Sequence, residues 1–348
     1  MDTTAPTVSV SLLMPGQEAS WDAFANAMPE ATFFHLSGWK NVIERALGHR
    51  TYYLQATRAG TIVGILPLAH VKSLLFGNAL ISNGFCVYGG PVALDAQALA
   101  ALDAEAIALS AKLGADYLEY RPMVPSHSEW PQKRDLYVTF RKPILPDIDA
   151  NMKAIPRKQR AMVRKGIGFG LSSVLDDDVT RLHHVYAESV RNLGTPVFPK
   201  AFFRALKQEF GPLCDIVTIV HEREPVASVM NFYFRDEVLP YYGGGTSKAR
   251  ALAANDFMYW EVMRRACERG CRLFDFGRSK IGTGSYDFKR YWGFEPTPLI
   301  YEYSLGKAGA IPDLSPLNPK YQAFIALWRR LPLWLSKAMG PYIARNLG

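Results

Sequence analysis

The chain has 348 residues, of which 49% are hydrophobic and 21% charged, which excludes a disordered chain and is typical of a globular protein of about two domains. Its formal net charge of +8 favours an anionic partner, such as RNA, a nucleotide-linked substrate or an anionic membrane surface, without identifying one. No apolar run approaches the ~20 residues of a membrane-spanning helix, and the N-terminus does not read as a signal peptide, so we expect a cytoplasmic protein.

The first half of the chain predicts a β-hairpin, a glycine-rich stretch, a helix and a strand, in that order. The hairpin strands are residues 51–56 and 61–71, and the glycine-rich stretch is residues 82–91. The helix spans about residues 95–113, because leucines and alanines recur there at helical spacing, and Gly114 ends it. The strand is residues 116–120.

The second half repeats this order with similar lengths. Strands are predicted at 215–221, 226–235 and 238–242, and three glycines follow them. A helix over about 255–269 ends at Gly270, and a strand follows at 271–276. The repeated order indicates an internal duplication, although the same order is common in α/β proteins and that alternative stays open.

A strand, a helix and a second strand imply a right-handed parallel crossover, and the hairpin adds antiparallel strands. The sequence therefore predicts an α/β fold of two tandem acetyltransferase-like (GNAT-like) domains, each a mixed central sheet flanked by helices. We expect the first domain over residues 1–150 and the second over residues 151–305. The break lies near Pro143 to Ile155, and a helix beginning near Pro156 opens the second domain.

The C-terminal region, residues 306–348, predicts a basic amphipathic helical tail. From Pro319 onward it has five basic residues and no acid, with tryptophans and leucines between them. Pro332 divides it into two short helices. Two interpretations remain open, a segment lying peripherally on the inner face of the plasma membrane and a pair of helices packed on the second domain.

Three segments together resemble the FemA/FemB/FemX family, whose members carry two GNAT-like domains and add amino acids to peptidoglycan precursors. They are residues 33–40 (FFHLSGWK), residues 157–166 (RKQRAMVRKG), and residues 275–278 (DFGR) followed by 286–294 (YDFKRYWGF). The chain looks most similar to the Fem-like proteins that accompany exosortase (PEP-CTERM) and exopolysaccharide systems.

Transfer of an acyl group to an amine needs a group that stabilises the negative oxygen of the tetrahedral intermediate. Lys289 is the predicted cation, and the resemblance implies the same role because the Phe-Lys position serves it in the family. The alternative is a surface lysine or a structural salt bridge. Tyr242, at the end of the central strand, is predicted to shuttle a proton or donate a hydrogen bond, with a core tyrosine as the alternative.

Substrate binding is predicted in three places. Arg157, Arg160 and Arg164 share one face of a helix free of acids, which suits phosphate, although a solvated face is the alternative. The remaining candidates are Trp39 and Lys40 in the first domain, and Asp275, Gly277, Arg278 and Phe288 in the second.

The donor is predicted to bind where GNAT enzymes hold a pyrophosphate, at the segment containing Arg250, Ala253 and Asn255. Ala253 and Asn255 replace the usual glycines, which weakens the case for CoA. The chain also lacks the long helical hairpin of the bridge-building Fem enzymes, which puts aminoacyl-tRNA in doubt as well. We expect no tightly bound cofactor and no metal, and a donor that is either aminoacyl-tRNA or an acyl group on CoA or acyl-carrier protein.

These patterns predict an N-acyl- or aminoacyltransferase acting on a peptidoglycan or exopolysaccharide precursor. The expected partner is a phosphate-bearing small-molecule or lipid-linked substrate, with tRNA as a possible donor carrier and no specific DNA binding. One alternative is an N-acyltransferase that acylates an amino acid or a sugar amine from acyl-CoA or acyl-carrier protein. Another is a non-catalytic GNAT pair that binds RNA or membrane. The cysteines and the adjacent His183 and His184 are interpreted as structural.

Overall fold

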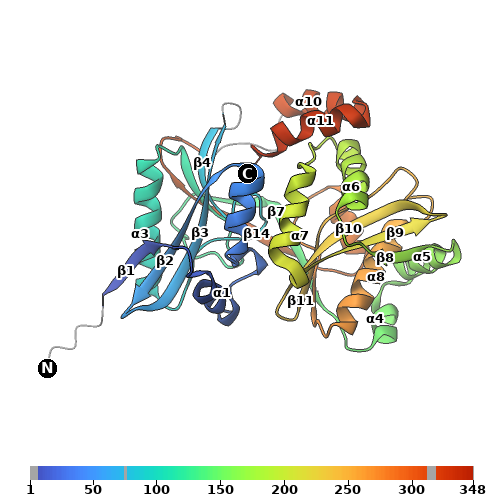
Figure 1. Cartoon of the computed structure of the whole chain (residues 1–348), viewed down its shortest axis with the longest axis horizontal. Helices are drawn as coiled ribbons and strands as arrows, with labels where there is room; N and C mark the ends of the chain where they lie inside the picture. Colours follow the sequence, from blue (N-terminus) through green and yellow to red (C-terminus); the bar gives the residue numbers. More distant parts are fainter. Residues whose placement is uncertain (1–6, 74–76, 312–318, 348) are drawn as a thin grey trace. The chain divides into compact units, whose positions relative to one another are not determined.

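The computed structural model describes residues 7–73, 77–311 and 319–347, and among these it describes no side chain for residues 319–321. The described chain divides into two compact units. The first unit contains residues up to 135 together with 299–311 and 346–347, and the second contains residues 136–298 and 319–345. Each unit is a sheet with helices packed on it (Figure 1).

The sheet of the first unit has the strand order β1-β2-β3-β4-β6-β14. The strands are β1 (Val8–Leu12), β2 (Arg50–Arg58), β3 (Thr61–Ser73), β4 (Gly77–Ser82), β6 (Tyr117–Tyr120) and β14 (Pro296–Leu305), and a short β5 (Val92–Ala93) pairs with β3. Neighbouring strands are antiparallel, except that β4 and β6 are parallel. Helix α3 (Ala96–Lys112) makes the crossover between these two strands, while α1 (Glu18–Ala27) and α2 (Gly38–Val42) lie between β1 and β2 in the sequence.

The sheet of the second unit has the strand order β8-β9-β10-β11-β12-β7. The strands are β8 (Ser172–Leu175), β9 (Cys214–His221), β10 (Glu224–Phe234), β11 (Glu237–Gly245), β12 (Leu273–Asp275) and β7 (Gln132–Pro143), and a short β13 (Ser279–Lys280) also pairs with β7. Again all neighbours are antiparallel except one pair, β11 and β12, which α8 (Ala254–Glu268) connects.

The two sheets therefore repeat the same pattern strand for strand, which confirms the predicted α/β fold of two tandem GNAT-like domains. In both, two antiparallel pairings precede a parallel crossover through one helix. The sequence analysis missed one element of this pattern. It read the first repeat as passing from the hairpin into a glycine-rich stretch, whereas β4 lies there as a third strand.

The last strand of each sheet comes from the other half of the chain. β7 follows β6 in the sequence, but its residue Arg141 pairs with Asp275 of β12. β14 follows β12, but its residue Glu302 pairs with Tyr120 of β6. The units consequently differ from the expected ranges 1–150, 151–305 and 306–348. The second unit begins within β7, ahead of the proline cluster, and residues 299–311 return to the first unit.

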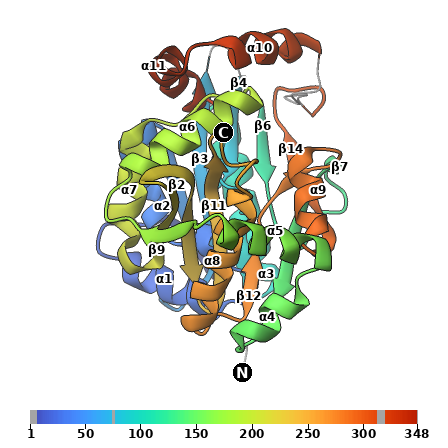
Figure 2. The ribbon, with the colours of Figure 1, turned by 90° about the vertical axis from the view of Figure 1, so that its right-hand side faces the viewer.

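Helices cover both faces of the second sheet. On one side lie α6 (Thr180–Leu193) and α7 (Lys200–Phe210), and on the other lie α8 and α5 (Arg157–Gly168), as Figure 2 shows. The α8 side contains a core of buried rings and aliphatic side chains that includes Phe257, Phe276 and Trp292. Two short helices, α4 (Ile148–Ala154) and α9 (Gly284–Tyr291), pack at the edge of this core.

The tail forms two helices, α10 (Pro319–Arg330) and α11 (Leu333–Ala344), separated at Pro332 as predicted. They pack on the second unit, because Trp328 is buried and Arg191 of α6 donates to the carbonyl of Leu331 at 3.2 Å. The interpretation of the tail as packed helices is thus confirmed for its inner face. In the part of the chain that the structure describes, no helix is long and apolar enough to cross a bilayer.

Candidate functional site

The candidate site lies where β11 and β12 separate. These parallel strands pair only through Glu237↔Leu273 and Val238↔Phe274. After these two pairs, the chain that follows β12 stays beside β7 and not β11: Phe276 N donates to the carbonyl of Phe140 at 2.8 Å. A register shift between β10 and β11 leaves Tyr241 outside the pairing, and such a bulge redirects the side chains and amides around it. The second unit therefore has an interrupted ladder at this point.

Lys289 lies at the exit of β12. Thr283 begins α9 by accepting a hydrogen bond from Tyr286 N at 3.4 Å, and the helix turns Lys289 inward so that only 8% of it is exposed. Its Nζ donates to the carbonyl oxygens of Phe276 at 2.6 Å, Gly277 at 3.0 Å and Arg278 at 3.1 Å. Lys289 is therefore a buried lysine that points at the Gly277 backbone. Its catalytic role stays a prediction.

Burial also changes the ionisation of Lys289. Desolvation of the ammonium lowers the pKa of Lys289 to about 7, the positive charge of Arg278 adds to the lowering, and the negative charge of Asp275 opposes it. Near neutral pH both the ammonium and the neutral amine are accessible. The ammonium already uses three donors on carbonyls, so stabilising an oxyanion requires one of these bonds to be exchanged for the bond to the substrate.

Asp275 fixes the backbone that holds Lys289. It is fully buried, and its Oδ1 accepts from Gly277 N at 2.6 Å, where φ of +65° suits glycine. Its Oδ2 lies 3.2 Å from Nε of Arg141, which also pairs with Glu237. Burial and the negative charge of Asp275 raise the pKa of Glu237, while Arg141 opposes this shift. The result is a charge cluster shared by β7, β11 and β12.

Arg141 and Glu237 were not among the residues that the sequence singled out. Glu237 begins a strand whose other residues are apolar or glycine, and a charged residue in such a strand is a signal that a partner is buried beside it, whereas Arg141 is one of several charged residues in β7 and carries no such signal. The sequence did not show that Arg141, Glu237 and Asp275 contact one another, because β7 pairs with β12 only through the exchange of strands between the two repeats. Arg278, by contrast, was predicted, and its guanidinium lies 4.3 Å from the ring centre of Tyr137.

Tyr242 and Phe288 are both packed among aromatic rings. Tyr242 is 5% exposed and contacts α6 and α7, with ring centres 5.3 Å from Phe203 and 5.7 Å from Phe202. Phe288 lies 5.5 Å from Tyr259 on the α8 side. Lys289 and Tyr242 thus pack against different sets of rings. A proton-transfer role for Tyr242 stays a prediction.

The predicted phosphate-binding helix is α5. Arg157 and Arg164 are exposed, while Arg160 is half-buried and donates to the carbonyl of Lys153 at 3.1 Å. The opposite face is buried, and at Gly166 an added Cβ would lie 2.9 Å from Cβ of Phe257 in α8. Close packing through glycine therefore holds the helix with its arginines outward, and their binding role remains untested.

The predicted donor segment keeps a turn that favours glycine. Ala253 has a φ of +53° and is buried, so its amide is not open to a phosphate in this conformation. Arg250 is exposed and Asn255 is half-buried. The first turn of α8 also carries Asp256, whose buried carboxylate accepts from Trp292 Nε1 at 3.1 Å. This negative charge at the helix N-terminus disfavours a pyrophosphate there.

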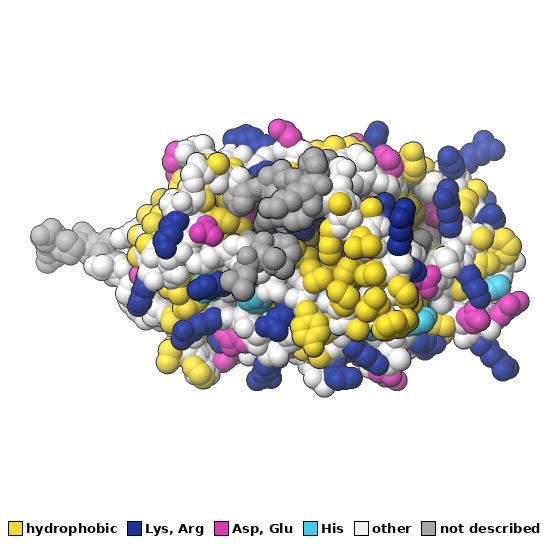
Figure 3. All heavy atoms as spheres, turned by 90° about the horizontal axis from the view of Figure 1, so that it is seen from above, with side chains coloured by type: hydrophobic (Ala, Val, Ile, Leu, Met, Phe, Trp, Pro, Cys, Tyr) yellow, Lys and Arg dark blue, Asp and Glu magenta, His cyan; other side chains and the backbone are white. Residues whose placement is uncertain are grey.

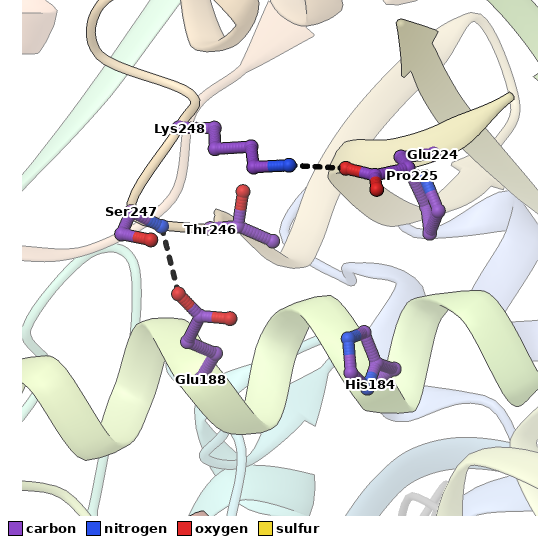
Figure 4. A pocket seen from close by; sticks show the side chains of 7 residues that line it. All are labelled: His184, Glu188, Glu224, Pro225, Thr246, Ser247 and Lys248. Atoms are coloured by element: carbon purple, nitrogen blue, oxygen red, sulfur yellow. Dashed lines mark hydrogen bonds and ion pairs between the residues drawn. The ribbon is translucent and has the colours of Figure 1, made fainter. Parts of the chain in front are cut away.

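A polar pocket of about 340 Å³ lies beside that segment. Figure 4 shows His184 and Glu188 of α6 on one side of it and Thr246, Ser247 and Lys248 on the other, with Glu224 and Pro225 of β10 completing the lining. Ser247 N donates to Glu188 Oε1 at 2.7 Å, and Lys248 pairs with Glu224. The sequence gave none of these residues a site role, and His184 was interpreted as structural.

The candidates of the first unit are packed or paired. Trp39 is fully buried against Phe33 and Phe34, so a substrate would reach it only after it is uncovered. Lys40 pairs with Glu44 at 2.8 Å on the same helical stretch. A substrate-binding role for Trp39 and Lys40 stays a prediction.

The described residues contain no group of three or more His, Cys, Asp or Glu side chains placed to hold a metal ion. All four cysteines are buried and none forms a disulfide, in agreement with their interpretation as core residues.

Comparison with known proteins bears on the fold. Residues 150–290, which include Lys289, match the family described as the acetyltransferase (GNAT) domain, and no curated protein matches the sequence. The structure is similar to a crystal structure of FemX, with a TM-score of 0.69 and 14% identity over 91% of this chain and 100% of that chain.

Two further solved structures share the fold. A tandem GNAT protein from the clavulanic acid biosynthesis pathway has a TM-score of 0.55 and 13% identity over 86% of this chain and 98% of that chain. A conserved protein of unknown function from Bacteroides thetaiotaomicron has a TM-score of 0.56 and 10% identity over 86% and 100% of the two chains. The predicted Fem-like pair of GNAT domains is thus confirmed as a fold. The association with exosortase systems stays a prediction.

Proposed function

We propose that this protein transfers an acyl or aminoacyl group to an amine of a phosphate-bearing precursor of the cell envelope, and that its second unit carries the reaction. The observation behind the proposal is the buried Lys289 ammonium, held within 3.1 Å of three backbone carbonyls where β11 and β12 separate. The GNAT domain match over residues 150–290 and the FemX-like fold support the class of reaction.

In this reaction the acceptor amine attacks the carbonyl carbon of an ester or thioester. A C–N bond forms, the C–O or C–S bond to the carrier breaks, and the proton lost by the amine ends on the leaving oxygen or sulfur. The carbonyl oxygen carries a full negative charge in between, and a preorganised cation in a dry site stabilises it. Lys289 supplies that cation, and Asp275 positions it by holding the Gly277 turn.

The exposed arginines of α5 fit the other half of the substrate. Arg157 and Arg164 present guanidinium groups, which bind phosphate through paired hydrogen bonds, and no acidic residue lies between Asn151 and Lys165 to neutralise them. A nucleotide diphosphate or a lipid diphosphate carries the charge that this helix would recognise. Either group is a natural carrier for a cell-envelope precursor.

The acyl donor is either an ester on tRNA or a thioester on CoA or acyl-carrier protein. Ala253 and the Asp256 carboxylate at the start of α8 disfavour a pyrophosphate in the usual GNAT position, which supports an ester on tRNA over acyl-CoA. The second form of the proposal is an N-acyltransferase that depends on acyl-CoA or acyl-carrier protein and acts on an amino acid or sugar amine. It is supported by the fold shared with a tandem GNAT protein from the clavulanic acid biosynthesis pathway.

The test compares Lys289→Met with Arg290→Met, a matched change at the next, exposed residue of the same helix. Aminoacyl-tRNAs and acetyl-CoA serve as donors, and a nucleotide-linked peptidoglycan precursor serves as the acceptor. We expect Lys289→Met to lower turnover about 100-fold, the scale of losing one oxyanion donor, and Arg290→Met to leave it unchanged. Lys289→Met also leaves three carbonyl oxygens without the hydrogen bonds that Nζ donates to them, so we expect some loss of stability as well.

The pH profile separates catalysis from structure. If the ammonium stabilises the oxyanion, turnover falls as pH rises through the Lys289 pKa of about 7, and Lys289→Arg keeps its charge and removes that fall. Equal turnover in wild type and Lys289→Met overturns the assignment of Lys289. A wild-type protein that transfers from neither donor overturns the enzyme and favours a binding scaffold.

A further inference from the structure

The outer face of the tail helices is apolar and exposed. It consists of Phe324 and Leu327 of α10 and Trp334, Met339 and Tyr342 of α11, and we call these five residues the tail face. Leu327 is 63% exposed, Trp334 70% and Tyr342 74%. Figure 3 looks down on this part of the molecule and shows hydrophobic side chains gathered there, with Lys and Arg at the edges. Contiguous exposed apolar surface of this kind marks an interaction site.

One side of α11 packs on the second unit and the other side is exposed. Ser336, Gly340 and Ala344 recur every four residues and are buried. At Gly340 an added Cβ would lie 3.0 Å from Val197, so small residues bring the helix against the second unit. Trp334 and Tyr342 lie on the opposite side, because they are offset by half a turn from the buried row. Their exposure is therefore a consequence of how the helix is seated.

The positive charge around the tail face indicates what kind of surface binds there. Arg329, Arg330 and Arg345 are exposed and Lys337 is half-buried, while residues 314–348 contain no Asp or Glu. A second protein surface would usually bring mixed charges, whereas a layer of anionic lipid headgroups presents negative charge alone. Trp and Tyr suit the same place, because they have an apolar body and a polar edge and concentrate at membrane interfaces.

We propose that the tail face docks the protein onto the surface of an anionic lipid bilayer. α10 and α11 lie in the interface with Trp334, Tyr342, Leu327, Phe324 and Met339 among the upper acyl chains. The surrounding Arg and Lys side chains contact the headgroups, as in other interfacial amphipathic helices. The tail stays seated on α6 throughout, so docking needs no unfolding. The tail face is a different surface from the candidate site at Lys289, so membrane docking does not depend on the proposed reaction.

The test uses the full chain and sedimentation with vesicles of phosphatidylcholine alone or of phosphatidylcholine mixed with phosphatidylglycerol. We expect binding to the mixed vesicles and little binding to phosphatidylcholine. Tyr342→Ser combined with Trp334→Ser should reduce binding at least tenfold, because two interfacial aromatics are removed. Tyr291→Ser is the matched control, since Tyr291 is 57% exposed but lies on α9, and it should bind as wild type does.

Charge and position are tested separately. Arg330→Glu should weaken binding to the mixed vesicles by about tenfold or more, because it exchanges an attraction for a repulsion, while Arg45→Glu in the first unit should not. Brominated lipids should quench the fluorescence of the wild type, and Trp334→Phe should abolish most of that quenching.

Three results would overturn the proposal. The first is a wild-type protein that binds neither kind of vesicle, and the second is binding by the tail-face variants that is as tight as that of the control variants. The third is a protein that is dimeric by light scattering and becomes monomeric in Tyr342→Ser, because the tail face would then be an interface between two copies of the chain.

Discussion

At the scale of single residues, the site depends on a cation that is held without being neutralised. The partners of the Lys289 ammonium are three carbonyl oxygens, which accept hydrogen bonds but carry no net charge. The nearest carboxylate in this network, Asp275, has its oxygens engaged by Arg141 and by Gly277 N. In the proposed reaction, the positive charge of Lys289 stabilises the oxyanion once one of the three hydrogen bonds is exchanged for a bond to the substrate. Its desolvation is the reason that its pKa lies near neutrality.

A second buried charge cluster stabilises the first unit and gives a prediction about pH. His127 Nε2 lies 2.8 Å from Asp103 and its Nδ1 lies 3.1 Å from Glu302, a carboxylate that is fully buried. Burial alone would lower the pKa of His127, but hydrogen bonds to these two carboxylates and their charges outweigh it and raise the pKa to about 9. The ring also stacks on Trp130 at 4.2 Å.

Because the folded pKa exceeds that of an unfolded histidine, this group stabilises the protein fully below about pH 6.5 and loses its contribution as pH rises through about 9. His127→Gln should lower the free energy of unfolding by on the order of 2 kcal/mol at pH 6 and by much less at pH 10. Urea denaturation at the two pH values measures this. His221→Gln, which lies outside the cluster, should leave the change in the free energy of unfolding between pH 6 and pH 10 as it is in the wild type. If His127→Gln also leaves that change unaltered, the stabilising role of His127 is wrong.

The candidate residues show what sequence could predict at this scale. Lys289, Asp275 and Gly277 were all singled out, because they sit where a strand ends in glycine and a short helix follows. Arg141 was not, although it contacts Asp275, since 134 positions separate the two in the chain. A partner that far away is visible only once the strand pairing is known.

At the scale of elements, α5 illustrates how one residue sets the distance between two helices. Gly166 lies against α8, and a methyl group there would approach Phe257 Cβ to 2.9 Å and Leu171 Cδ1 to 3.3 Å. Gly168, two residues later in the same helix, has no atom within 4 Å of the equivalent position. The two glycines have helical backbones with no positive φ, so they differ mainly in their neighbours.

Gly166→Ala should therefore destabilise the protein by about 1–3 kcal/mol through overpacking, despite the better helix propensity of alanine. Gly168→Ala provides the control and should be neutral or stabilising by up to about 1 kcal/mol. Denaturant unfolding of both variants measures the difference. If the two variants have equal stability, α5 and α8 do not pack as closely as the structure shows.

The secondary structure was easier to predict than the site. The helices of residues 96–112 and 254–268 and the hairpins before them follow from periodicity and turn residues, which are local properties. β4 was hidden because its six residues lie beside a glycine-rich stretch that reads as a loop. The tail was predicted as two helices with two possible roles, and the burial of Trp328 in α10 and of Ser336, Gly340 and Ala344 in α11 showed which face packs.

At the scale of the whole molecule, the duplication was predictable but the exchange of strands was not. The repeated order of elements can be recognised from the sequence, because each element has its own local pattern. The partner of an edge strand cannot, because it depends on where the chain returns in space. β7 and β14 each follow one repeat and complete the sheet of the other. A cut at the apparent linker between the repeats, near residue 150, therefore separates strands from the sheets that need them.

This exchange predicts that the first repeat does not fold alone. A fragment of residues 7–145 lacks β14, which exposes the edge of β6 and removes Glu302, the carboxylate that accepts from the backbone N of His127 at 2.7 Å and of Ser126 at 3.0 Å. It also loses the buried Tyr301 and Tyr303. An unpaired β6 edge and the loss of one of the two carboxylates that bind His127 should leave this fragment largely unfolded or aggregated.

The matched fragment joins residues 7–135 to residues 299–311 through a flexible glycine-serine linker, so that β14 returns in its own register. We expect this fragment to give dispersed amide resonances and cooperative unfolding, whereas residues 7–145 should give neither. Glu302→Gln in the rescued fragment should weaken it, because the His127 charge then loses one of its two carboxylates. A cooperatively folded 7–145 fragment would show that the first repeat does not depend on β14, and that the returning strand only covers a sheet already stable on its own.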